Sequence, residues 1–227
     1  MSRKVNHQFF KDMTYPQAIE YLSSASEGDF VFRPSRKGND HLALTVKFPG
    51  EKYINYDIIE HDKPDQFSLG NRLELDKKIY RDLDHIYAHF LDPLFRNISN
   101  LRRFNKYFSG TKDQVEVALR QELDQKPSRI PYYICLDPTH AGRFLIYYQY
   151  GRTIKQETVI VTTEGYNFHS KLYSDPVQLI NGFKRYMSDR LERKRQSEDA
   201  GRSNNFSGSG NFNQQSRYSN NPPTSAW

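Results

Sequence analysis

The sequence predicts a chain of mixed helices and strands that is built from two similar units in tandem. Two helix starts share one capping pattern, Thr14-Tyr15-Pro16-Gln17 and Thr111-Lys112-Asp113-Gln114. Each is followed by three strand-like runs and then by a helix that begins with Tyr-x-Asp, at Tyr80 and at Tyr173. Because the same elements occur twice in the same order, we expect an internal duplication.

In the first unit, Thr14 is the expected N-cap of the first helix, with a proline in its first turn. Three runs rich in aromatic and β-branched residues predict strands. They are Phe30–Phe32, Leu42–Val46 and Tyr53–Ile59. We therefore expect one helix and then three strands before the Tyr80 helix.

The Tyr80 helix leads into the segment between the two units. Pro93 interrupts its apolar spacing, so we expect a break or a kink there. Leu94 to Phe104 resumes helical spacing. A helical linker that packs against both units is therefore predicted.

The second unit repeats the plan of the first. Thr111 caps its first helix, and the Tyr-x-Asp motif at Tyr173 opens its last helix. The predicted strands are Ile130–Leu136, Phe144–Tyr150 and Thr158–Thr162.

Composition limits the possible classes of protein. The chain has 227 residues, of which 36% are hydrophobic, and a formal net charge of +6, so we expect an anionic partner. Cys135 is the only cysteine, which excludes an internal disulfide and a cysteine-rich zinc site. No apolar run approaches the length of a membrane span, and polar residues follow Met1, so we expect neither a membrane segment nor a signal peptide.

The C-terminal segment differs from the rest. Ser, Asn and Gly make up half of residues 196–227, without helical or strand periodicity. Such a composition cannot bury enough apolar surface to offset the entropy lost on ordering. We expect a disordered tail over residues 193–227.

Arg33 is the anomaly of the first unit, because it stands at the end of an apolar strand. A buried guanidinium needs an anionic partner, and the strand-like run Phe30–Phe32 that leads to Arg33 contains no carboxylate. Ser35, Arg36, Lys37 and Gly38 follow directly and offer a hydroxyl, cations and exposed amides, the groups that bind phosphate. The residues alone leave two interpretations open: an ion pair with a distant Asp or Glu, or a phosphate pocket.

The segment from Phe30 to Ser35 resembles the strand of Src-homology-2 domains whose arginine binds the phosphate of a phosphorylated ligand. Two such units in tandem resemble the modules of a family of transcription elongation factors that also act as histone chaperones. The resemblance covers roughly residues 5–190. It implies an α+β fold of two Src-homology-2-like domains, each a small antiparallel sheet flanked by two helices and joined by a helical linker.

The resemblance also implies domain bounds and a function. We expect an N-terminal domain over residues 5–92, a helical linker over 93–109, a degenerate second domain over 110–192, and the tail. The implied function is to recruit the elongation factor to the phosphorylated linker of the largest RNA polymerase II subunit in the nucleus. The resemblance further implies a monomeric module within a longer protein, chromatin-associated, without enzymatic activity or cofactor.

Two positions depart from the pattern of a phosphotyrosine reader. Tyr15 stands where such domains carry an arginine in the first helix, and Asn55 stands where they carry a histidine on the third strand. We therefore expect phosphothreonine, phosphoserine or a multiply phosphorylated ligand as well. In the second unit, Cys135 or Leu136 matches Arg33, and neither side chain binds phosphate.

The candidate ligands of the first phosphate pocket are Arg33, Ser35, Arg36, Lys37, Gly38 and His41. Ser35 has an alternative role in stabilising the turn, and the basic loop residues could simply be solvated. Lys106 and Lys184 are candidates for a second phosphate site, or else ordinary surface lysines. We find no catalytic constellation and no metal-ligand spacing.

The alternative function is nucleic-acid binding. The positive charge would attract phosphates, and aromatic side chains could stack on bases. The residues concerned are Tyr107, Phe144, Tyr147, Tyr148 and Tyr150. These aromatics could equally fill the faces of strands, which we expect.

Overall fold

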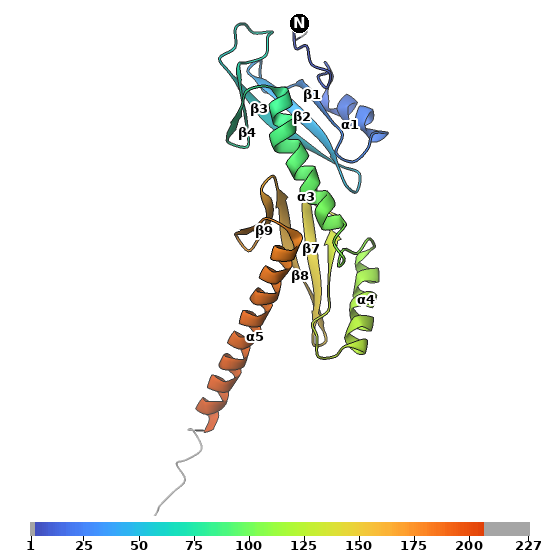
Figure 1. Ribbon diagram of the computed structural model, residues 1–227, viewed down its shortest axis with the longest axis vertical. Helices are drawn as coiled ribbons and strands as arrows, with labels where there is room; N and C mark the ends of the chain where they lie inside the picture. Colours follow the sequence, from blue (N-terminus) through green and yellow to red (C-terminus); the bar gives the residue numbers. More distant parts are fainter. Residues whose placement is uncertain (1–2, 207–227) are drawn as a thin grey trace, which may run out of the picture. The chain divides into compact units, whose positions relative to one another are not determined.

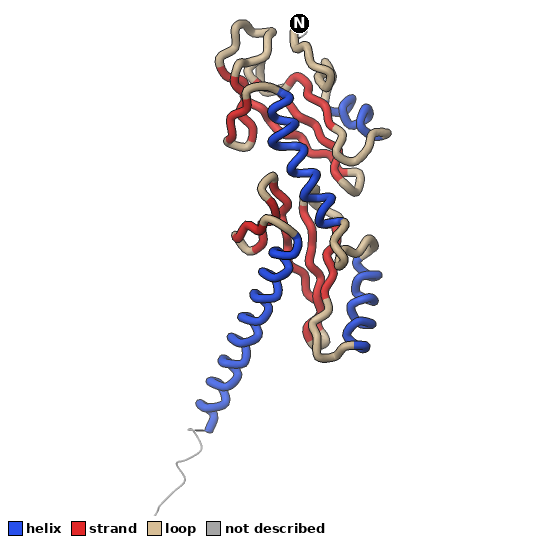
Figure 2. Tube along the Cα trace, in the orientation of Figure 1, coloured by secondary structure: helices blue, strands red, loops and turns tan. Residues whose placement is uncertain are grey.

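The computed structural model describes residues 3–206, without the side chains of 195 and 198–206. The chain divides into one compact unit, Met1–Ile180, and a second that begins at Asn181. The first unit contains two five-stranded antiparallel sheets, coloured blue to teal and yellow to brown in Figure 1. The two sheets have the same plan, and helices precede and follow each of them (Figure 2).

The first sheet has the order β1-β2-β3-β4-β5. Its strands are β1 (Phe30–Pro34), β2 (His41–Phe48), β3 (Lys52–His61), β4 (Arg72–Leu75) and β5 (Lys78–Tyr80). Sequence analysis predicted the first three strands and missed the last two, which are only four and three residues long. Such short runs are too brief to show the period of two that identifies a strand.

Helix α1 (Tyr15–Ser23) packs against β2 (Figure 1). The backbone N–H of Thr14 donates to Oε1 of Gln17 at 2.8 Å, as the capping pattern predicted. The buried Ala18 and Leu22 of α1 meet Val31 of β1 in a small core cluster. The first predicted helix therefore starts at its predicted cap and covers the sheet.

The second sheet repeats the arrangement, in the order β10-β9-β8-β7-β6. Its strands are β6 (Tyr132–Leu136), β7 (Arg143–Tyr150), β8 (Thr153–Thr162), β9 (Gly165–Phe168) and β10 (Lys171–Tyr173). Helix α4 (Lys112–Gln125) begins after Thr111, whose backbone N–H donates to Gln114 at 2.9 Å. The elements predicted for the duplication thus occur in both halves, but the two Tyr-x-Asp helices begin later than predicted. Tyr80 and Tyr173 end β5 and β10, and the helices start at Leu83 and Pro176.

The segment between the sheets is helical from Leu83 to Arg102, as α2 (Leu83–Ile86), the π-helical η1 (Tyr87–Leu91) and α3 (Asp92–Arg102). The expected break at Pro93 takes the form of that π-helical turn, which ends two residues before the proline. The ring of Phe95 lies 5.0 Å from that of Phe48, whereas the amide of Asn97 donates to the carbonyl of Thr162 at 2.9 Å. Helix α3 therefore packs against both sheets.

The helical part of the linker is shorter than predicted. Beyond α3, the N–H of Phe108 donates to Ile134 of β6, and Ile134 donates back to Lys106. This bridge pairing requires extended backbone, which ends the helix before residue 104.

Helix α5 (Pro176–Phe206) corrects the prediction for the tail, because it continues through residues 193–206, which we expected to be disordered. The stretch Leu191-Glu192-Arg193-Lys194 that carries it across this boundary consists of strong helix formers. The remainder of the predicted tail, residues 207–227, lies outside the described residues.

Candidate functional site

Arg33 lies on β1 opposite Ala43 of β2, with only 5% of its surface exposed. The preceding residues of the strand, Phe30, Val31 and Phe32, are apolar and buried, because β1 is covered on both faces there. The strand therefore holds the guanidinium away from bulk water at the point where β1 ends.

The guanidinium of Arg33 donates only to neutral oxygens. Nε donates to Oγ1 of Thr45 at 3.0 Å, and Nη2 donates to Oδ1 of Asn55 at 2.6 Å. Nη1 donates to the carbonyl of Pro34 at 3.1 Å. No carboxylate of the described residues forms an ion pair with Arg33, and the carboxylate of Asp57, which lines the same cleft, pairs with Lys37 and His41.

Burial lowers the pKa of Arg33 below its ordinary value, and the nearby Arg36 acts in the same direction, whereas Tyr15 opposes the shift. An arginine remains protonated at neutral pH despite such a shift. The ring of Tyr15 lies 5.3 Å from the Cζ atom of Arg33, in cation–π geometry. Tyr15 is the first residue of α1, so the capped helix start brings this ring to the end of β1.

Arg33 opens into a cleft of about 440 Å³. The cleft is lined by Tyr15, Arg33, Ser35, Arg36, Lys37, Ala43, Asn55 and Asp57. The loop between β1 and β2 supplies the hydroxyl and two of the cations, and β3 supplies an amide and a carboxylate. An anion in this cleft would meet a buried guanidinium at its base and flexible cations at its rim.

The loop between β1 and β2 is partly occupied by its own contacts. Oγ of Ser35 accepts from the backbone N–H of Lys37 at 3.2 Å, which is the turn-stabilising alternative considered for this serine. Nζ of Lys37 donates to Asp57 at 3.0 Å. Gly38 has a φ of +148°, and a Cβ there would come within 2.8 Å of Asp40, so a glycine is required.

The structure brings four of the six predicted ligands together, namely Arg33, Ser35, Arg36 and Lys37. Gly38 and His41 do not line the cleft. Nδ1 of His41 lies 3.1 Å from Oδ1 of Asp57, so this ring is engaged with a carboxylate. The role of each residue as a phosphate ligand stays a prediction.

Sequence analysis missed Thr45 and Asp57 as members of the site. Thr45 lies in the middle of an apolar run, and nothing in the sequence distinguishes it from a core threonine. Asp57 would have been found by asking which alternate residues of β3 face the same side as Asn55. Tyr15 and Asn55 were noted only as departures from a family pattern, and both contact Arg33.

The second sheet places a different set of residues at the equivalent position. Phe10 bridges Phe32 in the first half, and Tyr107 bridges Ile134 in the second. Arg33 and Cys135 are the next residues on their strands, so the equivalence is with Cys135 and not with Leu136. By the same register, Tyr147 matches Thr45 and Gln156 matches Asn55.

No comparable cation lies at that position in the second sheet. Cys135, Leu145 and Tyr147 form a buried cluster with Val115 and Leu119 of α4. Burial raises the pKa of the Cys135 thiol to about 12, so this cysteine is a neutral apolar side chain. The space that forms a polar cleft in the first half is filled by an apolar core in the second.

The two lysines proposed for a second phosphate site belong to different units. Nζ of Lys106 donates to Glu122 at 2.7 and 2.9 Å and lies 4.8 Å from the centre of the Tyr133 ring. Burial opposes ionisation of Glu122, yet hydrogen bonds from Lys106 and Tyr133 hold the pKa of this carboxyl below its ordinary value. Lys184 is exposed on α5, in the unit that begins at Asn181.

The aromatic residues considered for base stacking are mostly inside the fold. Phe144, Tyr147 and Tyr148 are buried, and Tyr150 is 38% exposed. No metal-binding group of three His, Cys, Asp or Glu side chains occurs among the described residues. Within residues 3–206, no helix combines the length and the apolar composition that a membrane span requires.

The chain is similar to known proteins over most of its length. A family model described as SH2 domain matches residues 1–186. Transcription elongation factor spt-6 of Neurospora crassa is 33% identical over 195 residues, which cover 85% of this chain and 14% of that protein. The SPT6 homolog of Arabidopsis thaliana is 30% identical over 196 residues, which cover 84% of this chain and 12% of that protein. The chain therefore spans about one seventh of such relatives.

Solved structures agree with the observed fold. A tandem SH2 domain of transcription elongation factor Spt6, which binds the phosphorylated RNA polymerase II C-terminal repeat domain, matches with a TM-score of 0.74 and 30% identity. The match covers 82% of this chain and 96% of that one. The tandem SH2 domains of Antonospora locustae Spt6 match with a TM-score of 0.64 and 21% identity, over 81% of this chain and 99% of that one. The predicted α+β tandem fold is confirmed.

Proposed function

Because this chain belongs to the SH2 domain family, we propose that it is a non-enzymatic phosphopeptide-binding module in which Arg33 binds the phosphate. One observation carries the proposal. Arg33 is buried and cationic, yet its hydrogen bonds within the described residues go only to neutral oxygens. A buried charge without a counter-charge costs several kcal/mol, and a bound phosphate removes that cost.

The geometry of Arg33 suits a phosphate. Its three hydrogen bonds use one N–H from each nitrogen, so one N–H remains on Nη1 and one on Nη2. Two such N–H groups form the bidentate contact that guanidinium makes with phosphate oxygens. The hydroxyl of Ser35 and the cations of Arg36 and Lys37 complete the shell from the loop.

The proposed ligand is a phosphorylated segment of the largest RNA polymerase II subunit. The similar Spt6 tandem domain binds the phosphorylated C-terminal repeat domain of that enzyme. We propose the linker before those repeats as the segment read here, in the nucleus, by a monomeric module that recruits a longer elongation factor. The net charge of +6 agrees with an acidic ligand.

A neighbouring cleft supports a peptide over a free phosphate. It has a volume of about 450 Å³ and shares Asn55 and Asp57 with the Arg33 cleft. Leu75, Phe90 and Leu94 provide apolar lining. A peptide whose phosphate contacts Arg33 could place its flanking side chains here, so phosphate and flanking sequence would be read together.

The environment of Arg33 favours phosphothreonine, phosphoserine or a multiply phosphorylated segment. The cleft has Tyr15 and Asn55 where a typical phosphotyrosine reader has an arginine and a histidine, so fewer cations surround a long aromatic phosphoester. A second phosphate near Lys106 or Lys184 would raise avidity by roughly 10² to 10⁴. At Lys106 it would compete with Glu122.

The test is a peptide panel titrated by fluorescence anisotropy at two salt concentrations. The peptides carry linker or repeat sequence with phosphotyrosine, phosphothreonine, phosphoserine, pairs of these, or no phosphate. We expect phosphate-dependent binding with a shallow dependence on salt. A steep dependence with no preference for phosphopeptide over single-stranded nucleic acid would instead support the alternative function.

Two variants of Arg33 assign the site. Arg33→Ala should weaken binding by roughly 2–5 kcal/mol, because a buried charge pair is broken. Arg33→Lys keeps the charge but loses the fork, so it should recover only part of the affinity. Arg72→Ala is the matched control, since Arg72 is an exposed arginine paired with Asp62 outside the cleft. Equal binding by wild type and Arg33→Ala would contradict the proposal.

A further inference from the structure

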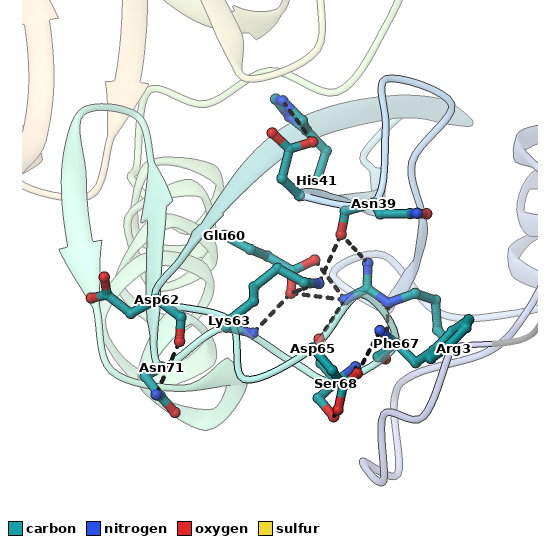
Figure 3. Close-up of polar contacts among 12 residues, drawn as sticks. Arg3, Asn39, His41, Glu60, Asp62, Lys63, Asp65, Phe67, Ser68 and Asn71 are labelled. Carbon is teal, nitrogen blue, oxygen red and sulfur yellow. Dashed lines mark hydrogen bonds and ion pairs between the residues drawn. The ribbon is translucent and has the colours of Figure 1, made fainter.

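A buried ion-pair network lies behind the loop between β1 and β2. The carboxylate of Glu60, at the end of β3, is fully buried, and Nη2 of Arg3 donates to its two oxygens at 2.7 and 2.8 Å. Nζ of Lys63 donates to the same carboxylate at 3.0 Å, and the N–H of Gly70 at 2.9 Å. Figure 3 shows both cations converging on Glu60.

Both cations also hold the loop itself. Nη1 of Arg3 donates to the backbone carbonyl of Asn39 at 2.9 Å, and Nζ of Lys63 donates to the same carbonyl at 2.7 Å (Figure 3). The backbone N–H of Glu60 donates to the carbonyl of Asp40 at 2.8 Å. Three donors therefore fix two successive carbonyls of the loop that carries Ser35, Arg36 and Lys37.

The rest of the loop has weaker restraints. Its side-chain tie to β3 is the ion pair of Lys37 with Asp57, and the Lys37 side chain is 62% exposed. Exposed pairs of this kind contribute little to conformational stability. Gly38 adds freedom because its backbone adopts a φ of +148°. The conformation of the loop thus depends largely on the contacts behind Asn39.

We propose that Arg3 and Lys63, held by Glu60, are positioning residues for phosphate binding. They do not line the Arg33 cleft. They act by fixing the Asn39 carbonyl, which keeps the loop in the conformation that presents Ser35, Arg36 and Lys37 to the phosphate. The inference rests on the proposed function of the cleft, and it extends the site to Arg3, thirty residues before Arg33.

The test compares phosphopeptide affinity with thermal stability in Arg3→Met, Arg3→Lys and Lys63→Met. The same substitutions are made in a background of Arg36→Ser with Lys37→Ser. We expect Arg3→Met to weaken binding by about three- to tenfold, and Arg3→Lys to recover part of the loss because it keeps a charged donor. In the background without the loop cations, the effect of Arg3→Met should fall to less than twofold, because these residues act through that loop.

Lys47→Met is the matched control. The Lys47 side chain is 5% exposed, like that of Arg3 at 6%, and its ammonium donates to the carbonyls of Ser23 and Ala25, away from the loop. It should lower the melting temperature and leave the affinity unchanged. In the absence of ligand, the amide chemical shifts of residues 35–40 should differ from those of the wild type in Arg3→Met and should be unchanged in Lys47→Met.

Each remaining outcome decides the question. Wild-type affinity in Arg3→Met and Lys63→Met, together with loss of binding in Arg33→Ala, overturns the positioning role and leaves the proposed function standing. An undiminished effect of Arg3→Met without the loop cations also overturns it. If Arg3→Met does not fold, Lys63→Met decides, because it removes a donor to the same carbonyl. Full binding by Arg33→Ala overturns the proposed function itself.

Discussion

Arg33 and Cys135 occupy the same position in two sheets of one design, but their surroundings are opposite. Around Arg33, the neighbouring strands supply Thr45 and Asn55, which accept its hydrogen bonds. Around Cys135, the same positions carry Tyr147 and Gln156, and the tyrosine packs into an apolar cluster with α4. The fold tolerates either a polar cleft or a filled core at this point.

The loops that follow β1 and β6 also differ in the polar groups that they present. In the first half, the loop directs a hydroxyl and two cations into the cleft. In the second, the carboxylate of Asp137 accepts from the N–H groups of Thr139 at 2.7 Å and His140 at 3.2 Å. The second loop therefore uses its own side chain as the anion for its amides. The two sheets have the same plan, and the Arg33 cleft of the first has an apolar cluster as its counterpart in the second.

The largest effect is expected from placing an arginine in the second sheet. Cys135→Arg would bury a charge among apolar side chains without acceptors such as Thr45 and Asn55. We expect the free energy of unfolding to fall by about 3–5 kcal/mol, without new phosphate binding. Urea unfolding measures this loss of stability, with Cys135→Ala as the control. A stable variant that binds phosphate would contradict the claim that the second sheet cannot accommodate an arginine at this position.

The reverse change in the first sheet should not destabilise the protein. In Arg33→Met, an apolar chain of similar length replaces the buried guanidinium, and the hydroxyl of Thr45 already donates to Asn55 at 3.1 Å, so these groups stay paired. We expect the free energy of unfolding of the ligand-free protein to stay the same or to rise by up to about 3 kcal/mol, because the cost of burying the charge is removed. A loss of about 3 kcal/mol or more in urea unfolding would make Arg33 a structural residue.

The carboxylate at the rim of the cleft should limit affinity. Asp57 pairs with Lys37 and His41, and it lines the Arg33 cleft. Asp57→Asn removes a negative charge near the phosphate and frees Lys37. Phosphopeptide affinity should therefore rise by about two- to fivefold, which corresponds to the contribution of one partly exposed ion pair. Asp62→Asn, which removes a carboxylate outside the cleft, is the control. Weaker binding by Asp57→Asn would show that Asp57 instead helps to bind the ligand.

The smallest effect concerns the Cys135 thiol. Because its pKa is about 12 in the folded protein against an ordinary 9.0, Ellman's reagent should react slowly at pH 8 until denaturant is added. The neutral thiol contributes stability that is complete below pH 9 and is lost as the pH rises toward 12. Cys135→Ala should remove that part of the alkaline decline. Rapid labelling of the folded protein would contradict burial of the thiol.

Most of the fold could be predicted from local patterns. The capping residues Thr14 and Thr111 start their helices, and the runs rich in aromatic and β-branched residues form β1–β3 and β6–β8. The missed strands β4, β5, β9 and β10 have no more than four residues each, too few for periodicity to be visible. The helix past residue 193 was missed because overall composition was weighed above the helix formers Leu191 to Lys194.

The site was harder to predict than the fold, because it depends on strand register. Arg33 stood out as a charge in an apolar strand, but its acceptors Thr45 and Asn55 become neighbours only when β1, β2 and β3 pair. Pairing also places Asp57 beside the ring of His41, a contact that the sequence did not predict, and the role of His41 as a phosphate ligand stays a prediction. Arg3 gave no local signal, since its partner Glu60 lies 57 residues away.

The most direct test of the account is an NMR titration of ¹⁵N-labelled protein with a singly phosphorylated polymerase peptide. We expect shifts at residues 31–37, 45 and 55, and none at the equivalent residues 133–139, 147 and 156. The unphosphorylated peptide should leave both sets unchanged. Shifts centred on Cys135 and Tyr147, or shifts around Arg33 that do not depend on phosphate, would contradict the claim that the first half alone holds this phosphate site.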